Sequence, residues 1–203
     1  MSVPDHYFSP DPAAPEAVRT IRVPIAGVER ELVTATGVFS GDRLDAGTAV
    51  LLDAVPAPPE TGELLDLGCG WGPIAATLAT RSPGARVWAV DVNARALSLV
   101  ERNAELLSLS NITPATPELV PEHVRFATIW SNPPIRIGKP QLHALLEAWI
   151  PRLEPGGTAW LVVQKHLGAD SLLRWLAERF EGFEVERADS KRTYRIIAVT
   201  APD

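Results

Sequence analysis

The sequence predicts an α/β fold: a Rossmann-like sheet of seven mostly parallel strands with helices on both faces, a C-terminal antiparallel hairpin and a short N-terminal β-hairpin extension. Three observations predict it. From residue 60 onward, short apolar runs alternate with segments of helical periodicity, which is typical of a doubly wound parallel sheet. A glycine-rich turn at 68–72 follows the first run. A short polar loop joins the last two runs, at 183–187 and 194–200, and suits antiparallel pairing.

The N-terminal part is expected to add a small β-structure to this sheet. The first 18 residues contain four prolines and little periodicity, so we expect a flexible arm there. Alternating apolar residues on either side of Ala26-Gly27 predict a β-hairpin, and a lid loop and a short helix capped near Asp45 or Thr48 follow it. We therefore divide the chain into an arm at 1–18, a hairpin, lid loop and short helix at 19–59, and a main domain at 60–203.

In the main domain, each apolar run leads into a turn and then a helix. Pro73 suits a first helical turn, and Asn93 can cap the next helix. Pro114 and Pro117 limit the third strand to a short edge. Pro155-Gly156-Gly157 is expected to stop the chain before the fifth strand. Strands are expected at 64–67, 87–90, near 112, and at 127–131, 159–163, 183–187 and 194–200, with later helices at 142–153 and 172–180.

Composition narrows the possible functions. The chain has 203 residues, of which 46% are hydrophobic, enough for one core, and its net charge of −6 argues against broad non-specific binding of nucleic acid. Cys69 is the sole cysteine and the four histidines are scattered, so we predict no disulfide and no metal site. No apolar stretch approaches the ~20 residues that span a bilayer, and no signal-peptide pattern begins the chain. We expect a cytoplasmic protein without membrane contact.

The run from Asp66 to Gly72, Asp-Leu-Gly-Cys-Gly-Trp-Gly, predicts a nucleoside site. Glycines let the backbone turn tightly and approach a ligand closely. Asp91 follows Gly70 by 21 residues (91 − 70), the spacing at which an acidic side chain accepts both ribose hydroxyls. Pro73 stands where a dinucleotide site has its third glycine, which argues against NAD.

The second chemical signal is Asn132-Pro133-Pro134, at the end of the fourth strand. Proline fixes its own φ and restricts the residue before it, so this corner can present two rigid acceptors, the Asn132 side-chain oxygen and the Pro133 carbonyl. Two such acceptors can bind both hydrogens of an exocyclic amine, which suits transfer of a group to a planar nitrogen. Because the carboxyl ends of parallel strands meet at one edge, we expect this corner and the glycine turn to share a cleft.

These motifs resemble those of class I S-adenosylmethionine-dependent methyltransferases. More narrowly, Gly37–Ser40, Leu44–Thr48 and Ser131–Lys139 resemble the methyltransferase small domain family, which includes ribosomal RNA guanine-N2 methyltransferases. The similarity spans roughly residues 30–200 and implies S-adenosylmethionine as cofactor. Where many amine methyltransferases have an aromatic residue after Asn-Pro-Pro, this chain has Ile135, so stacking on a base is expected from elsewhere, with Phe39 as a candidate.

The resemblance implies a role for each matching residue. The cofactor residues are expected to be Asp66, Gly68, Cys69, Gly70, Gly72, Asp91, Val92 and Asn132, and Thr116 or Glu118 falls near the usual adenine contact. The catalytic residues are expected to be Asn132, Pro133 and Pro134. The substrate residues are expected to be Phe39, Ile135, Arg136, Lys139 and Lys165, of which the basic ones either bind phosphate or are simply solvated.

The leading hypothesis is an N-methyltransferase that acts on an exocyclic base amine of RNA, in particular guanine N2 of small-subunit ribosomal RNA, so that RNA or the small ribosomal subunit is the partner. Methylation of a protein glutamine or of a small-molecule amine is the alternative, since a carboxamide presents the same two hydrogens to Asn132. A second alternative is a non-catalytic RNA-binding domain that keeps the methyltransferase fold. No oligomeric state is predicted.

Overall fold

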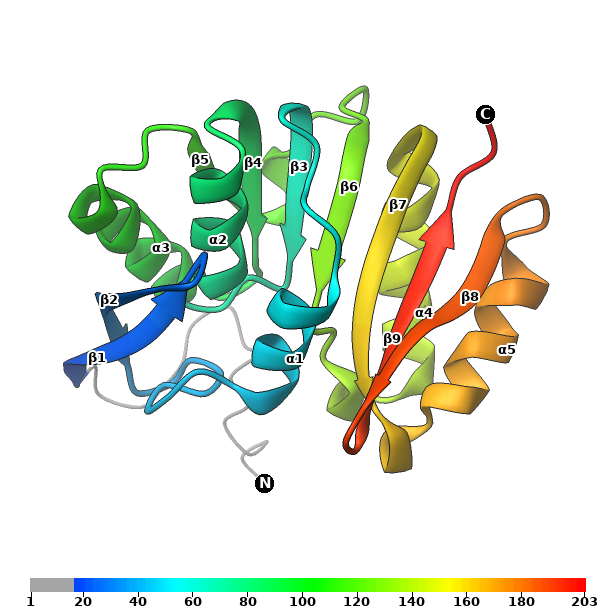
Figure 1. The fold of residues 1–203 in the computed structure, drawn as a ribbon, viewed down its shortest axis with the longest axis horizontal. Helices are drawn as coiled ribbons and strands as arrows, with labels where there is room; N and C mark the ends of the chain where they lie inside the picture. Colours follow the sequence, from blue (N-terminus) through cyan, green and yellow to red (C-terminus); the bar gives the residue numbers. More distant parts are fainter. Residues whose placement is uncertain (1–16) are drawn as a thin grey trace.

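The computed structural model describes residues 17–203 and shows one large sheet flanked by helices, with a separate hairpin beside it (Figure 1). The predicted arm at 1–18 lies outside the described residues except for its last two, and Val18 already begins the first strand. The strands are β1 (Val18–Ile25), β2 (Val28–Ala35), β3 (Thr61–Leu67), β4 (Gly84–Val90), β5 (Ile112–Ala115), β6 (Phe126–Ser131), β7 (Leu153–Gln164), β8 (Glu184–Lys191) and β9 (Tyr194–Thr200). The helices are α1 (Ala46–Ala54), α2 (Pro73–Arg81), α3 (Ala94–Leu107), α4 (Lys139–Trp149) and α5 (Ala169–Arg179).

The large sheet has seven strands in the order β5-β4-β3-β6-β7-β9-β8, which confirms the predicted fold. Pairing is parallel from β5 through β7, while β9 runs antiparallel to both of its neighbours, β7 and β8. After β3 the chain builds outward through β4 and β5, and then returns to place β6 on the other side of β3. Such a reversal opens a crevice at the carboxyl ends of the strands.

Both faces of the sheet are covered, because the buried strands carry apolar residues on each side. On β3, Leu64 belongs to the apolar cluster beneath α1 and α2, whereas Leu65 and Leu67 belong to the cluster beneath α4 and α5. Figure 1 shows α1 and α2 in front of the sheet and α4 behind it. This two-sided burial makes the sheet a rigid platform whose loops carry the site.

Strand β7 departs from the predicted stop at Pro155-Gly156-Gly157, because the strand continues through these residues as a bulge. Phe126 pairs with Leu153 but Thr128 pairs with Thr158, so five steps on β7 oppose two on β6. Gly156 has φ +68°, and a Cβ on Gly157 would lie 3.0 Å from the Phe126 carbonyl oxygen. The glycines therefore let the bulge lie against β6. A sequence pattern alone does not distinguish such a bulge from the end of a strand.

The N-terminal hairpin is fixed to α3 by one buried amide. Asn103 donates to the carbonyl oxygens of Val33 and Trp71, both at 2.9 Å, and accepts from the Val33 N–H at 2.7 Å. The buried residues of α3 are Ala96, Leu99, Val100 and Asn103. The N-terminal hairpin packs on the side of α3 that carries Asn103, so part of the buried face of the helix is turned toward the hairpin.

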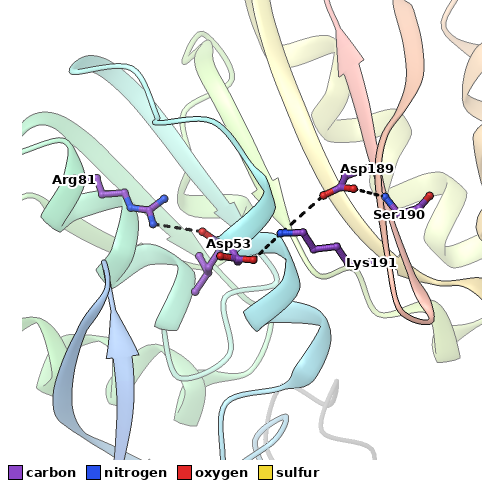
Figure 2. A network of polar contacts seen from close by, with 6 residues as sticks. Asp53, Arg81, Asp189, Ser190 and Lys191 are labelled. Carbon is purple, nitrogen blue, oxygen red and sulfur yellow. Dashed lines mark hydrogen bonds and ion pairs between the residues drawn. The ribbon is translucent and has the colours of Figure 1, made fainter.

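The C-terminal hairpin reaches α1 through exposed charged groups (Figure 2). Lys191, at the end of β8, lies 2.6 Å from Asp53 on α1 and 4.0 Å from Asp189. Arg81 at the end of α2 donates to the Leu52 carbonyl at 3.4 Å. Exposed pairs contribute little to stability. These contacts show, however, that the turn between β8 and β9 lies beside α1.

Candidate active site

A cavity of about 300 Å³ lies at the carboxyl ends of the strands. It brings together the glycine turn, Asp91 and the Asn-Pro-Pro corner, which are far apart in the sequence. Its lining residues are Phe39, Asp45, Gly68, Gly70, Asp91, Asn93, Ala96, Asn132, Pro133, Pro134, Ile135, Arg136, Val162, Gln164, Leu167 and Tyr194. The last four come from β7, the turn after it and β9, and no motif in the sequence marked them.

Gly68 and Gly70 leave open space in the cavity, while Gly72 serves packing. All three have positive φ, and a Cβ on Gly68 or Gly70 would meet nothing within 4 Å. A Cβ on Gly72 would lie 3.0 Å from Val100 of α3, so this glycine permits close helix packing and does not line the cavity. Cys69 is buried beside a narrower recess, and this burial raises the pKa of its thiol, so it stays unreactive.

Asp91 presents an anionic acceptor to the cavity at the end of β4. Its two oxygens accept from the N–H groups of Gly70 and Asn93, both at 2.9 Å. Burial raises the pKa of Asp91, and these backbone hydrogen bonds oppose that rise. Val92, the next residue, is exposed and does not line the cavity. Thr116 and Glu118 also lie outside the lining.

Asp66 lies beneath the glycine turn and not in the cavity. It is fully buried, and its Oδ2 accepts from the Ala75 N–H at 2.8 Å in the first turn of α2. Its Oδ1 has no hydrogen-bond partner among the described residues. Burial raises the pKa of Asp66 well above its usual range. From this position Asp66 holds the first turn of α2 against the glycine turn.

The Asn-Pro-Pro corner is held so that its acceptors remain available. Ser131 donates to the Leu67 carbonyl at 2.7 Å, which ties the end of β6 to the end of β3. The Asn132 amide nitrogen donates to Asp45 Oδ2 at 2.8 Å and to Thr48 Oγ1 at 3.1 Å. Both amide hydrogens are thus used, and Asn132 Oδ1 has no partner within residues 17–203. The Pro133 carbonyl accepts from the Ile135 N–H at 2.8 Å and keeps one lone pair.

The loop that carries Phe39 is fastened over the cavity from α3 and from the glycine turn. Asn93 donates to the Gly37 carbonyl at 2.9 Å, and Arg95 donates to the Thr36 carbonyl at 2.8 Å. Trp71 donates to the Ser40 carbonyl at 3.2 Å. Phe39 is 37% exposed and lines the cavity, as a lid residue does.

The basic residues named by the sequence fall in two groups. Arg136 is exposed and lines the cavity, beside Ile135. Lys139 and Lys165 do not line it, because one begins α4, with its amine 3.5 Å from Ser171, and the other follows β7 on the exposed surface. No group of three metal-binding side chains occurs in residues 17–203, and no helix in that range is long and apolar enough to cross a membrane.

A sheet of this order, with β9 inserted antiparallel between β7 and β8 and with the glycine turn and Asn-Pro-Pro corner in one cavity, defines a class I S-adenosylmethionine-dependent methyltransferase. The methyltransferase small domain family matches residues 29–198, and the chain belongs to that family. This confirms the resemblance carried by the motifs.

Relatives and solved structures agree with this class. Protein YbxB of Bacillus subtilis, an uncharacterized protein, is 35% identical over 196 residues, covering 95% of this chain and 96% of YbxB. Ribosomal RNA small subunit methyltransferase C of Aeromonas hydrophila is 33% identical over 167 residues, covering 80% of this chain and 47% of that protein.

The structure of the T. thermophilus 16S rRNA N2 G1207 methyltransferase (RsmC), in complex with AdoMet and guanosine, is 26% identical with a TM-score of 0.78. The match covers 94% of this chain and 52% of that one. The chain therefore spans about half the length of the ribosomal RNA methyltransferases that it matches.

Proposed function

We propose that this protein transfers the methyl group of S-adenosylmethionine to the N2 amine of a guanine in the RNA of the small ribosomal subunit. The observation that carries the proposal is the fixed amide of Asn132, which lines the same cavity as Gly68, Gly70 and Asp91 and whose nitrogen is already held by Asp45 and Thr48. The names of the matching methyltransferases support RNA as the substrate, and the guanosine bound to RsmC supports guanine.

The residues around the glycine turn fit the cofactor. Gly68 and Gly70 leave the space that a ligand needs close to the backbone, and Asp91 offers acceptors for two ribose hydroxyls. Phe39 covers this part of the cavity, while Asp66 and Gly72 support the turn from below. When bound, S-adenosylmethionine supplies a methyl group on a positively charged sulfur.

The corner residues position the amine without a strong base. Asn132 Oδ1 and the Pro133 carbonyl each accept one amine hydrogen, so the lone pair faces away from both acceptors and toward the methyl group. Holding both reactants in this way contributes on the order of 7–11 kcal/mol to lowering the barrier. The amine loses its proton only as it becomes cationic, and the carbonyl acceptors stabilise that charge.

The substrate side of the cavity opens toward exposed cations. Arg136 stands at the opening, and Lys139 and Lys165 lie on the surface outside it, where phosphate groups of a bound RNA are accessible to them. In this proposal Ile135 contacts the base by its apolar side chain. A ribosomal substrate places the enzyme in the cytoplasm.

The test is transfer of labelled methyl groups from S-adenosylmethionine to small ribosomal subunits, to free ribosomal RNA and to total protein. Digestion of the RNA to nucleosides should give N2-methylguanosine. Label found only in protein or in small molecules would replace the proposal with its rival, an amine or glutamine methyltransferase.

A further inference from the structure

Asp45 lies beside the Asn-Pro-Pro corner, and no contact described so far uses one of its carboxylate oxygens, Oδ1. Its Oδ2 caps α1 by accepting from the Thr48 N–H at 3.0 Å, and the same atom accepts from the Asn132 amide at 2.8 Å. Its Oδ1 has no partner among residues 17–203 and is not sealed inside the protein. The side chain lines the cavity. An anionic acceptor is thus available next to the atom that would bind the target amine.

The surroundings of Asp45 suit a planar ligand. Tyr194 also lines the cavity, and its ring lies so close to the start of α1 that a Cβ on Gly47 would be 3.0 Å from it. Partial burial and the nearby Asp45 carboxylate raise the pKa of Tyr194. An aromatic ring beside a polar edge is a common arrangement for holding a nucleobase.

Three acceptors therefore meet in this part of the cavity: the Pro133 carbonyl, Asn132 Oδ1 and Asp45 Oδ1. Three bases have an exocyclic amine. In guanine the N2 amine stands between N1–H, a donor, and N3, an acceptor, whereas in adenine and cytosine the one ring nitrogen beside the amine is an acceptor. Only guanine therefore offers a donor to a third acceptor. With adenine or cytosine, the carboxylate would face a ring nitrogen that is also an acceptor, and neither lone pair would have a donor.

We propose that Asp45 accepts a hydrogen bond from N1–H of the target guanine and so makes the enzyme select guanine over the other amine-bearing bases. This rests on the proposed function. The same carboxylate disfavours a glutamine side chain, because the amine of a carboxamide stands beside a carbonyl oxygen. Asp45 is thus a specificity residue at the substrate edge, in addition to its role in holding Asn132.

The informative variant is Asp45→Asn, because it keeps the cap. The Thr48 N–H and the Asn132 amide both donate, so the new carbonyl oxygen stays with them and the new amide group faces the cavity. A donor then replaces an acceptor at the position of N1. The matched control is Asp42→Asn, which removes an exposed carboxylate from the same loop and outside the cavity lining.

The substrates are two synthetic RNAs, one with the guanine that the wild-type protein methylates and one with 2-aminopurine in its place. 2-Aminopurine keeps the amine at C2 but has an acceptor at N1. We expect wild type and Asp42→Asn to prefer guanine by on the order of 10- to 100-fold in kcat/KM. We expect Asp45→Asn to lose this preference or to reverse it, with an unchanged Kd for S-adenosylmethionine by calorimetry.

The outcomes separate the two proposals. If the wild-type protein methylates no guanine, the proposed function fails and the role of Asp45 fails with it. If the wild-type protein methylates guanine but Asp45→Asn keeps the same ratio between the two RNAs, only the role of Asp45 is overturned. An unchanged ratio together with weaker cofactor binding would instead show that Oδ1 serves the amino group of the cofactor.

Discussion

Asn132 and Asp91 line the same cavity from the ends of β6 and β4, on either side of β3, but their contacts differ. Asn132 is held by Asp45 and Thr48 on the substrate side, whereas Asp91 is held by the backbone of the glycine turn. We expect Asn132→Ala to lower kcat on the order of 100-fold with little change in cofactor affinity, as for loss of one positioned polar group.

Asp91→Ala should act on the cofactor instead. Loss of a carboxylate that accepts ribose hydroxyls should weaken cofactor binding by about 1.5–3 kcal/mol. Calorimetry with S-adenosylmethionine measures cofactor affinity in both variants, and steady-state kinetics measures kcat, so together they test whether Asn132 and Asp91 have separate roles. Equal loss of cofactor affinity in Asn132→Ala and Asp91→Ala would contradict it.

Asp66 makes stability depend on pH. Its pKa is raised by burial, so the folded protein keeps a proton there at pH values at which the unfolded chain, with a pKa near 3.8, has lost it. The free energy of unfolding therefore falls as pH rises between these two pKa values, by up to about 1.4 kcal/mol per pH unit.

Asp66→Asn removes that dependence while it keeps an acceptor for the Ala75 N–H. In urea unfolding between pH 4 and 8, the free energy of unfolding of the variant should increase relative to that of the wild type as pH rises. Asp53→Asn serves as the contrast, because Lys191 lowers the pKa of Asp53, so the stability contributed by this carboxylate is lost only as pH falls below about 3.8 and stays nearly constant between pH 4 and 8. A difference between Asp66→Asn and wild type that stays constant with pH would contradict the expectation.

Single residues also show what the sequence could predict of the site. Gly68, Gly70, Asp91 and Asn132 lie in local patterns at strand ends, and the fold brings them to one cavity. Asp45 and Tyr194 were missed as lining residues, because each reaches the cavity from an element distant in the sequence. The local signals at Asp45 were the family resemblance of Leu44–Thr48, which assigned it no role, and the capping pattern, which explains one of its oxygens and not the other.

At the scale of elements, α3 joins the N-terminal hairpin to the glycine turn through Asn103. In Asn103→Ala, the Val33 N–H and the carbonyls of Val33 and Trp71 lose a buried partner. We expect a loss of about 1–3 kcal/mol in the free energy of unfolding. Glu105→Ala, on the exposed side of the same helix, is the control for helix propensity. Comparable loss in both variants by chemical denaturation would argue against the role of Asn103.

Elements also differ in how well the sequence predicts them. Strands such as β3 and β4, with continuous apolar runs before a turn, were expected at nearly their observed places. The course of β7 through Pro155-Gly156-Gly157 was not, because whether a glycine pair ends or bends a strand depends on the neighbour it packs against, here the Phe126 carbonyl. That contact is set by tertiary structure.

At the scale of the whole molecule, the RNA substrate that we propose has to bind a chain with a net charge of −6. Binding then depends on the few cations near the cavity opening. We expect Arg136→Gln, Lys139→Gln and Lys165→Gln each to lower the slope of log affinity against log salt concentration by about 1 where the residue contacts phosphate. RNA-binding isotherms at several salt concentrations measure the slope, with Arg125→Gln as the control far from the opening. A slope unchanged in all three variants would remove these residues from the RNA interface.

The position of β9 has a consequence for synthesis of the protein. This strand is made after β8 but lies between β7 and β8, and it brings Tyr194 to the cavity. A nascent chain that has produced every motif recognisable in its sequence still lacks an inner strand of the sheet and the pocket residue Tyr194. The complete pocket therefore forms only after β9, the last strand of the sheet to be synthesised, has left the exit tunnel.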